Sequence, residues 1–231
     1  NINALNGDAE IFGILLAGCV PVPLYPPARL NQIKDHLNRH CSILNNCKTP
    51  LLITLPEAKS FAHLLKARVE TLKSIMTVKD LCHQSDSFIE LDIGERELAF
   101  LQYTSGSTGM PKGVCLTHAN LLASVRTMGK ALQIKGNDVL VSWLPLYHDM
   151  GLIGAWLGSL YHGILLVIMS PLSFLNRPHR WLWAIHRYRG TISVAPNFAY
   201  DLCLKRIDPG LLEGLDLNCW RIAINGAESV S

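Results

Sequence analysis

The sequence has few charged side chains, and they form no run of one sign. Lys, Arg, Asp and Glu make up 17% of the 231 residues, and the formal net charge is +3. The arginines between residues 177 and 189 have helical spacing, so we interpret them as a solvent-exposed helix face. Nucleic acid is therefore not an expected partner. Hydrophobic residues reach 49%, which excludes a disordered chain and suffices for a core.

The sequence also lacks a cysteine framework and a secretory signal. Its seven cysteines are odd in number and irregularly spaced, with no C-x-x-C pair, so neither zinc nor disulfides are expected. Reduced thiols in the cytoplasm are the natural interpretation. The chain begins with Asn1 rather than Met, and no signal peptide follows. We expect it to be a piece of a longer protein.

One stretch without Lys, Arg, Asp or Glu, residues 151–172, is long enough to span a bilayer. It contains His162, reaches Pro171 near its end, and divides at Gly163 into a helix-like half and a β-branched half. A buried helix leading into a buried central strand explains this pattern better than a membrane span. We expect no transmembrane segment.

Strand-like and helix-like patterns alternate along the chain. Apolar, strand-like runs occur at residues 51–54, 98–103, 139–143, 164–169, 192–195 and 221–225. Apolar residues at helical spacing lie between most of them, for example at residues 61–72, 121–132 and 181–188. This alternation predicts an α/β fold with largely parallel sheets flanked by helices. Residues 82–94 are polar and aperiodic, which suggests one subdomain over residues 1–94 and a second over residues 95–231.

Residues 104–113 form a loop rich in glycine and hydroxyl groups, between a strand-like run and a helical run that starts near His118. Backbone N–H groups around glycines, with hydroxyls and one ammonium, can hold a phosphate. The spacing differs from G-x-x-x-x-G-K-[ST], because Pro111 precedes Lys112 and Gly113 follows it, which disfavours an ordinary P-loop enzyme. The alternative is a surface loop without a ligand.

Three further segments follow strands: residues 145–149, 195–198 and 226–228. Ligands gather at the carboxyl ends of strands in open α/β folds, so we expect these segments and the phosphate loop to form one site. His148 can donate to a carboxylate or phosphate. For Asp149 we favour a role as a helix N-cap. Phe198 and Tyr200 are either core residues or the wall of an apolar channel.

These strings resemble a known family. The run from Tyr103 to Val114 is similar to the phosphate loop of adenylate-forming enzymes, which include acyl-CoA synthetases, luciferase-like enzymes and peptide-synthetase adenylation domains. The runs 143–154, 170–178, 195–202 and 225–228, with 20–27, look like the fatty acyl-AMP ligase branch. The resemblance covers nearly the whole chain and implies part of the large N-terminal domain. Ser229 departs from it, because the family more often has Pro there.

The resemblance implies an ATP-dependent enzyme that forms an acyl-adenylate from a fatty acid, releases pyrophosphate and passes the acyl group to an acyl carrier protein. It implies Mg²⁺ as a cofactor, with no metal ligand in this chain. Lys112 and His148 would act in catalysis, and His148 would also lie beside the substrate carboxylate. The implied nucleotide-binding residues are Thr104, Ser105, Gly106, Ser107, Thr108, Gly109, Lys112, Asn225, Gly226, Ala227 and Glu228. The implied acyl-binding residues are Pro196, Asn197, Phe198 and Tyr200.

Two alternatives remain open within this resemblance. CoA could be the acyl acceptor, as in acyl-CoA synthetases, or the chain could be a catalytically silent nucleotide- or lipid-binding module. The chain ends before the family's adenine and Mg²⁺ motif, its ribose-binding Asp, its catalytic Lys and the insertion that distinguishes the two ligase types. We therefore expect the isolated piece to be inactive.

Overall fold

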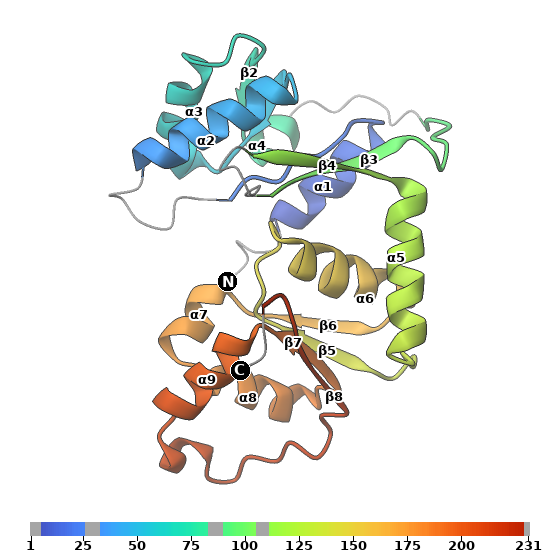
Figure 1. The fold of residues 1–231 in the computed structure, drawn as a ribbon, viewed down its shortest axis with the longest axis vertical. Coiled ribbons are helices and arrows are strands. Elements are labelled where there is room, and N and C mark those ends of the chain that lie inside the picture. The colour runs from blue at the N-terminus through green and yellow to red at the C-terminus, as the bar shows by residue number, and fades with distance from the viewer. Residues whose placement is uncertain (1–5, 26–32, 83–89, 105–110, 229–231) are drawn as a thin grey trace. The chain divides into compact units, whose positions relative to one another are not determined.

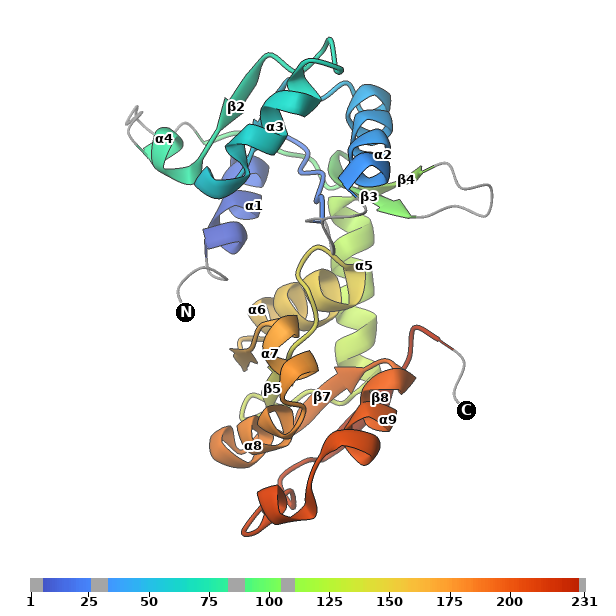
Figure 2. The same cartoon turned by 90° about the vertical axis from the view of Figure 1, so that its left-hand side faces the viewer.

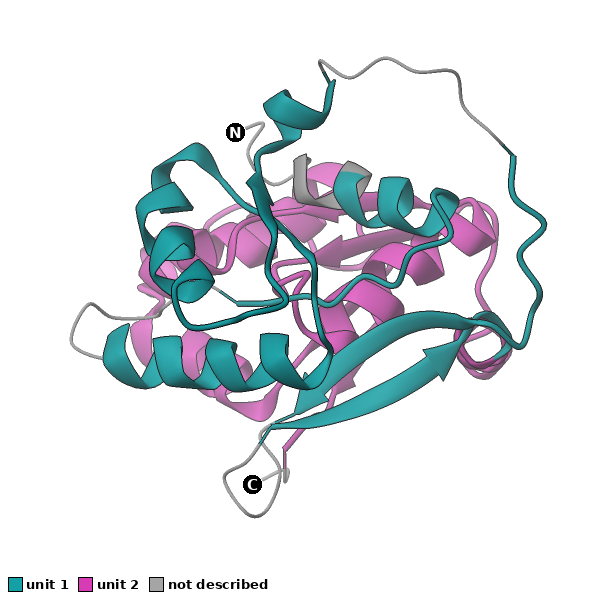
Figure 3. Cartoon of the chain, turned by 90° about the horizontal axis from the view of Figure 1, so that it is seen from above, with its two compact units in different colours: residues 1–119 teal, residues 120–231 magenta. Residues whose placement is uncertain are grey.

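The computed structural model describes residues 6–25, 33–82, 90–104 and 111–228. The chain folds into two compact units, residues 1–119 and residues 120–231, which are coloured separately in Figure 3. The subdomain boundary near residue 94 that the sequence suggests stays a prediction.

The first unit contains a short parallel sheet and an antiparallel hairpin. Its elements are α1 (Asn6–Leu16), α2 (Ile33–Asn46), β1 (Leu51–Ile53), η3 (Pro56–Ala58), α3 (Lys59–Lys66), β2 (Ser74–Met76), α4 (Val78–Cys82), β3 (Leu98–Thr104) and β4 (Lys112–Thr117). Strands β1 and β2 pair in parallel. Leu65, Val69 and Leu72, three of the residues expected on one apolar face, are buried in one cluster with Leu44 of α2.

Strands β3 and β4 pair antiparallel, a pairing that the sequence patterns did not predict. These patterns predicted that the phosphate loop leads directly into a helix near His118. Helix α5 (His118–Ala131) does begin there, but β4 comes first. The pairing connects Thr104 of β3 to Lys112 of β4, so the loop lies at the tip of a hairpin.

The second unit is built on a four-stranded sheet, visible in Figures 1 and 2. Besides most of α5, its elements are β5 (Val139–Ser142), η4 (Met150–Leu157), α6 (Gly158–His162), β6 (Leu165–Ile168), α7 (Pro171–Asn176), α8 (His179–Tyr188), β7 (Ile192–Ala195), α9 (Asn197–Arg206), η5 (Pro209–Leu212) and β8 (Ile222–Asn225). The strand order is β6-β5-β7-β8, and all three pairings are parallel. The expected α/β fold with largely parallel sheets is confirmed.

Helices cover both faces of this sheet. Leu140 and Val141 are neighbours on β5, so their side chains point to opposite faces. Leu140 packs with Ala155 of η4, whereas Val141 belongs to a cluster that includes Trp181 of α8 and Ala199 of α9. The chain therefore leaves β5 toward one face and leaves the adjacent β7 toward the other. In a doubly wound sheet, this divergence defines the switch point at which ligands bind.

The apolar stretch at residues 151–172 forms several short elements. The π-helix η4 and helix α6 precede Gly163, which has a positive φ of 64° and ends α6, and strand β6 follows. Within the described residues, no helix is both long and apolar enough to cross a membrane.

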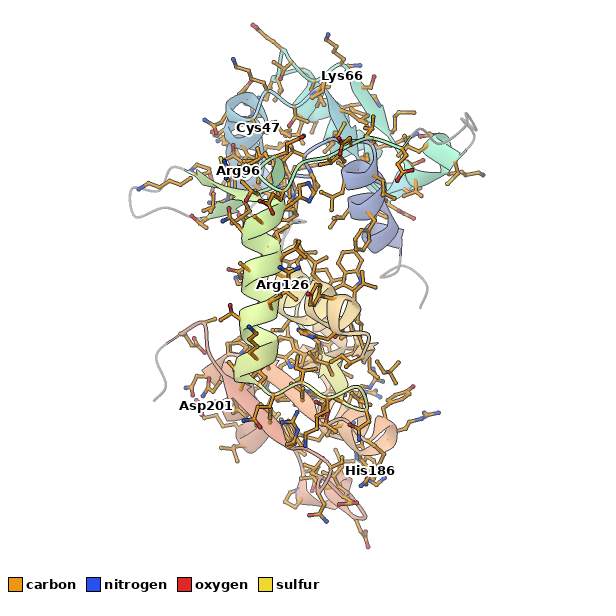
Figure 4. The ribbon with its side chains drawn as sticks, turned by 90° about the vertical axis from the view of Figure 1, so that its right-hand side faces the viewer. Cys47, Lys66, Arg96, Arg126, His186 and Asp201 are labelled. Carbon is orange, nitrogen blue, oxygen red and sulfur yellow. The ribbon has the colours of Figure 1, made fainter. Side chains whose placement is uncertain are left out.

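Hydrogen bonds from side chains connect the strands, helices and loops of the second unit. Asp138 is buried and accepts hydrogen bonds from Thr191 Oγ1 at 2.7 Å and from Arg221 Nη2 at 2.6 Å, which joins the starts of β5, β7 and β8. On α5, Arg126, which is labelled in Figure 4, donates to the Tyr161 hydroxyl at 2.8 Å. His186 of α8 accepts from the backbone N–H of Asp216 at 3.0 Å.

Candidate functional site

The phosphate-loop hairpin provides two described candidate residues. Thr104 ends β3, Lys112 begins β4, both are exposed, and they are register partners. They therefore mark the two ends of the loop. The predicted residues Ser105, Gly106, Ser107, Thr108 and Gly109 lie outside the described residues. Phosphate binding by this loop stays a prediction.

The base of this hairpin is anchored by Tyr103. Its side chain is buried, and its hydroxyl donates to Asn46 Oδ1 at the end of α2 at 2.5 Å. Burial, with smaller contributions from Cys47 and Cys115, raises the pKa of Tyr103, so the hydroxyl keeps its proton and remains a donor. Gly113 lies across the hairpin from Tyr103, and a Cβ there would lie 3.0 Å from the tyrosine ring. Sequence patterns did not predict this anchor, because the contact joins residues 57 positions apart.

In the second unit, the loop after β5 carries His148. Trp143 and Leu144 are buried at the start of this loop, and the exposed residues Tyr147, His148 and Asp149 follow. The loop closes tightly, because a Cβ on Gly151 would lie 2.3 Å from the Pro145 carbonyl oxygen. Only glycine fits at this position without a backbone shift, so Gly151 fixes the path of the loop.

His148 and Asp149 contact each other. His148 Nδ1 lies 2.6 Å from Asp149 Oδ1, and Asp149 Oδ1 also accepts the Met150 N–H at 2.7 Å. Asp149 thus caps η4, as expected from its position. A carboxylate can only accept, so the 2.6 Å contact assigns a ring proton to Nδ1, while the Met150 N–H lies farther from the same atom, at 3.4 Å. Both side chains are more than half exposed, so the pair contributes little to stability.

The segment after β7 places residues 196–200 at the same edge of the sheet. Phe198 is 44% exposed and makes an edge-to-face contact with Trp143, with ring centroids 6.0 Å apart. Tyr200 is half-buried, and its hydroxyl donates to the Ile224 carbonyl at 2.8 Å. Phe198 therefore presents an apolar surface to solvent, whereas the polar end of Tyr200 is already bonded to β8. Their binding of an acyl chain stays a prediction.

The segment after β8, residues 225–228, is bonded to the start of α9. Glu228 Oε1 accepts the Phe198 N–H at 2.7 Å, and Asn225 Nδ2 donates to Asn197 Oδ1 at 2.9 Å. Ala227 has φ 72°, a left-handed conformation that is uncommon for a residue with a Cβ. Glycine and alanine leave the backbone of this turn accessible to a flat ligand.

Three of the four expected segments thus share one edge of one sheet. The loops after β5, β7 and β8 are linked by the Trp143–Phe198 contact and by the two hydrogen bonds from Asn225 and Glu228. Trp143 Nε1 and Asn225 Oδ1 are buried and have no hydrogen-bond partner among the residues that the structure describes. A buried, unpaired donor and acceptor cost stability unless a ligand or water satisfies them. The fourth segment belongs to the first unit, and its convergence with the other three stays a prediction.

No group of three or more His, Cys, Asp or Glu side chains suitable for a metal ion occurs in the described part of the chain.

Comparison with known proteins places this geometry in a family. Residues 9–231 match the family of AMP-binding enzymes. The chain is 39% identical over 226 residues to a medium-chain fatty acid acyl-carrier-protein ligase, JamA from Moorena producens, and covers 38% of that protein. It is 36% identical over 230 residues to the long-chain-fatty-acid–AMP ligase FadD32 from Mycolicibacterium smegmatis, and covers 36% of it. These matches include 96% and 95% of the chain.

Solved structures agree with these sequence matches. The chain superimposes with a TM-score of 0.91 and 34% identity on a structure from a study of fatty acyl-adenylate ligases of E. coli and L. pneumophila, covering 96% of this chain and 40% of that one. The L. pneumophila ligase in complex with acyl adenylate and pyrophosphate gives a TM-score of 0.84 at 39% identity, covering 97% and 38%. The chain thus spans under half the length of these relatives. The resemblance read from the motifs is confirmed, and the chain belongs to the family of AMP-binding enzymes.

Proposed function

We propose that the whole protein activates a fatty acid with ATP, forming an acyl-adenylate and pyrophosphate. The observation that carries the proposal is the meeting of three loops at the switch point of the four-stranded sheet, in a chain of the AMP-binding family. The relatives named above support the substrate class, because both names specify fatty acids and the name of FadD32 also specifies AMP.

In the proposed reaction, a carboxylate oxygen of the fatty acid bonds to the α-phosphorus of ATP. The bond from that phosphorus to the bridging oxygen breaks, and pyrophosphate leaves with the electron pair. Such a transfer needs positioning and charge stabilisation rather than covalent chemistry from the protein.

Each candidate residue has a role in this scheme. Lys112, exposed at the end of the loop, would neutralise the leaving pyrophosphate, and Thr104 with the loop residues would bind the β- and γ-phosphates. Because Nδ1 of His148 is bonded to Asp149, only Nε2 would be available to the carboxylate of the fatty acid. It would donate a hydrogen bond to that carboxylate and orient it when protonated, and would otherwise act as a hydrogen-bond acceptor. The turn 225–228 would line the adenine, and residues 196–200 would contact the acyl chain.

Mg²⁺ enters the proposal only as an ion that would bind together with the nucleotide. When bound, it would neutralise phosphate charge. The described residues offer no cluster of ligands for it, so we assign no protein ligand and derive no step through the ion.

The test is ATP–pyrophosphate exchange by the whole protein with a series of fatty acids. We expect exchange that depends on the fatty acid, and exchange independent of every fatty acid would reject the assignment. His148→Ala should reduce kcat/KM by about tenfold to a hundredfold, because a misplaced reactant costs that much. His63→Ala, at an exposed histidine of α3, is the matched control and should leave exchange unchanged.

The acyl acceptor is the second part of the proposal. The name of JamA specifies an acyl carrier protein, so we propose the phosphopantetheine thiol of such a carrier. Incubation with ATP and fatty acid plus either CoA or a loaded carrier decides between the two acceptors. Abundant acyl-CoA would identify CoA, rather than the carrier, as the acyl acceptor. The absence of any acyl-adenylate would favour a catalytically silent binding module.

A further inference from the structure

Two side-chain contacts tie the end of β8 to the first turn of α9. Glu228 Oε1 accepts the Phe198 N–H at 2.7 Å, and Asn225 Nδ2 donates to Asn197 Oδ1 at 2.9 Å. The backbone N–H of Gly226 also bonds to the Ala195 carbonyl at 3.3 Å. The turn at residues 225–228 and the start of α9 therefore form one connected piece, although they are 28–30 residues apart in sequence.

The Glu228 contact has a clear physical basis. The first N–H groups of a helix have no partner within the helix, and a negative charge is favourable there. The residue before α9 is Pro196, whose side chain makes no cap hydrogen bond. Glu228 thus supplies from another element the cap that α9 lacks locally. Its bonded carboxylate oxygen is used for this purpose, and the small residues Gly226 and Ala227 leave room for a flat ligand against the turn.

We infer that Glu228 is a positioning residue that couples nucleotide binding to acyl binding. The inference rests on the proposed function, in which the turn 225–228 contacts adenine and residues 196–200 contact the acyl chain. Ala227 holds a backbone conformation that is costly for a residue with a Cβ, so the turn depends on its contacts for its shape. A ligand that fixes the turn also fixes the first turn of α9 through Glu228. Coupling of this kind is reciprocal between the two ligands.

The experiment measures this coupling in the whole protein by calorimetry. The dissociation constant of a non-hydrolysable ATP analogue is determined with and without saturating dodecanoate. We expect dodecanoate to tighten binding of the analogue by about fivefold or more in the wild type, which is the usual range for coupled sites. Glu228→Ala should bring this ratio close to one. Glu228→Gln keeps an acceptor oxygen and should retain most of the ratio, and Glu213→Ala, at an exposed glutamate of the same unit, should match the wild type.

The outcomes separate this inference from the proposed function. A wild-type protein that binds no fatty acid under any condition would refute the proposed function, and the inference with it. Fatty-acid-dependent exchange together with an unchanged ratio in Glu228→Ala would overturn the inference alone. So would a Glu228→Gln ratio as low as that of Glu228→Ala, because the hydrogen bond from the Phe198 N–H, which a glutamine oxygen can still accept, would then not be what couples the two sites. If Glu228→Ala does not fold, Asn197→Ala removes the second contact and should lower the ratio in the same direction; an unchanged ratio there would also overturn the inference.

Discussion

The two candidate ligand-binding regions of this protein differ in the kind of feature that identifies each of them, a local sequence motif or the topology of a sheet. The hairpin of β3 and β4 in the first unit is identified by a local string, and its described part offers Thr104 and Lys112 at the two ends of the loop. The carboxyl edge of the sheet in the second unit is identified by topology, because β5 and β7 send their connections to opposite faces. At this edge the loops are joined by side-chain contacts between residues that lie far apart in the sequence, so no short motif contains both partners.

This difference separates two kinds of functional residue. A loop that binds phosphate through backbone N–H groups needs glycines and hydroxyls in sequence order, so a motif can reveal it. A site assembled from three strand ends needs correct packing of the whole sheet. We therefore expect substitutions in the hairpin to change activity with little change in stability, and substitutions at the edge to change both.

Lys112 gives the largest expected effect. Removing the ammonium group in Lys112→Ala should lower kcat/KM for pyrophosphate exchange by roughly a hundredfold to a thousandfold, the range for loss of one group that stabilises transition-state charge. Because Lys112 is exposed, the melting temperature should stay nearly constant. Lys130→Ala, at an exposed lysine of α5, is the control and should leave the rate unchanged. A Lys112→Ala protein as active as the control would remove Lys112 from the mechanism.

Gly151 tests the edge of the sheet. A Cβ there would meet the Pro145 carbonyl at 2.3 Å, so Gly151→Ala should shift the His148 loop and reduce kcat/KM by about tenfold or more. It should also destabilise the protein by about 1–3 kcal/mol through overpacking. Gly154→Ala lies on the same π-helix with no atom within 4 Å of the new Cβ, and it should be silent in both measurements. Equal behaviour of the two variants would show that the loop does not depend on Gly151.

Acid should affect the two units unequally. His36 and His40 of α2 are buried, their ring centroids are 3.9 Å apart, and Tyr25, Arg39 and Phe61 are their ring or charge neighbours. Burial, with the charges of His36 and Arg39, lowers the pKa of His40 to about 3, and burial with Arg39 lowers the pKa of His36. In the second unit, burial alone would raise the pKa of Asp138, but hydrogen bonds from Thr191, the Lys135 N–H and Arg221 lower it overall.

The sign of each effect follows from the proton balance. An unfolded histidine binds a proton below about pH 6.5, whereas folded His40 excludes it. The contribution of His40 to the free energy of unfolding is therefore fully present above about pH 6.5, and it falls as the pH drops toward 3. The loss at pH 5 is about 2 kcal/mol from His40. The contribution of Asp138 is lost only below about pH 4.

Hydrogen exchange between about pH 7 and pH 5, corrected for the intrinsic rate, should therefore show loss of protection in α2 and not in β5. His40→Leu should reduce that loss, whereas His63→Leu should not. Equal loss of protection in both units would contradict the assignment.

The smallest expected effect concerns packing away from either site. A Cβ on Gly129 of α5 would lie 2.1 Å from His162 Nε2, so Gly129→Ala should destabilise the second unit by about 1–2 kcal/mol. Because the clashing atom is the end of a side chain, Gly129→Ala combined with His162→Ala should recover part of the loss. The control is Gly136→Ala, where no atom lies within 4 Å. Thermal unfolding compares these three variants with the wild type, and a destabilised Gly136→Ala would contradict the steric explanation.

Hydrophobic patterns predicted much of the fold. The six expected strands occur within one or two residues of their positions. Five of them belong to parallel sheets, whose strands read as continuous apolar runs, and the sixth, β3, carries such a run although it pairs antiparallel. Strands β2 and β4 were missed: β2 begins with a serine and has only two apolar residues, and β4 is largely exposed with lysine and glycine as its first residues.

The site could be predicted in its segments but not in its connections. The sequence indicated that residues 145–149, 195–198 and 226–228 follow strands, and these strands, β5, β7 and β8, are parallel members of one sheet. The bond from Phe198 N–H to Glu228 and the role of Trp143 as a partner of Phe198 depend on the register of separate strands. The anchor of the hairpin, Tyr103 to Asn46, depends likewise on tertiary packing. Sequence patterns carry no information on such pairings.

The π-helical segment after His148 has a consequence for how this protein can tolerate change. Its eight residues, Met150 to Leu157, make wider turns than an α-helix, so they hold a surplus residue relative to a regular helix of similar height. Deleting one residue there would let the segment rewind as an α-helix and keep its backbone bonds, while rotating everything that precedes it about the helix axis. Homologous chains could in this way redirect the imidazole of His148 by changing their length, without replacing any residue at the edge of the sheet.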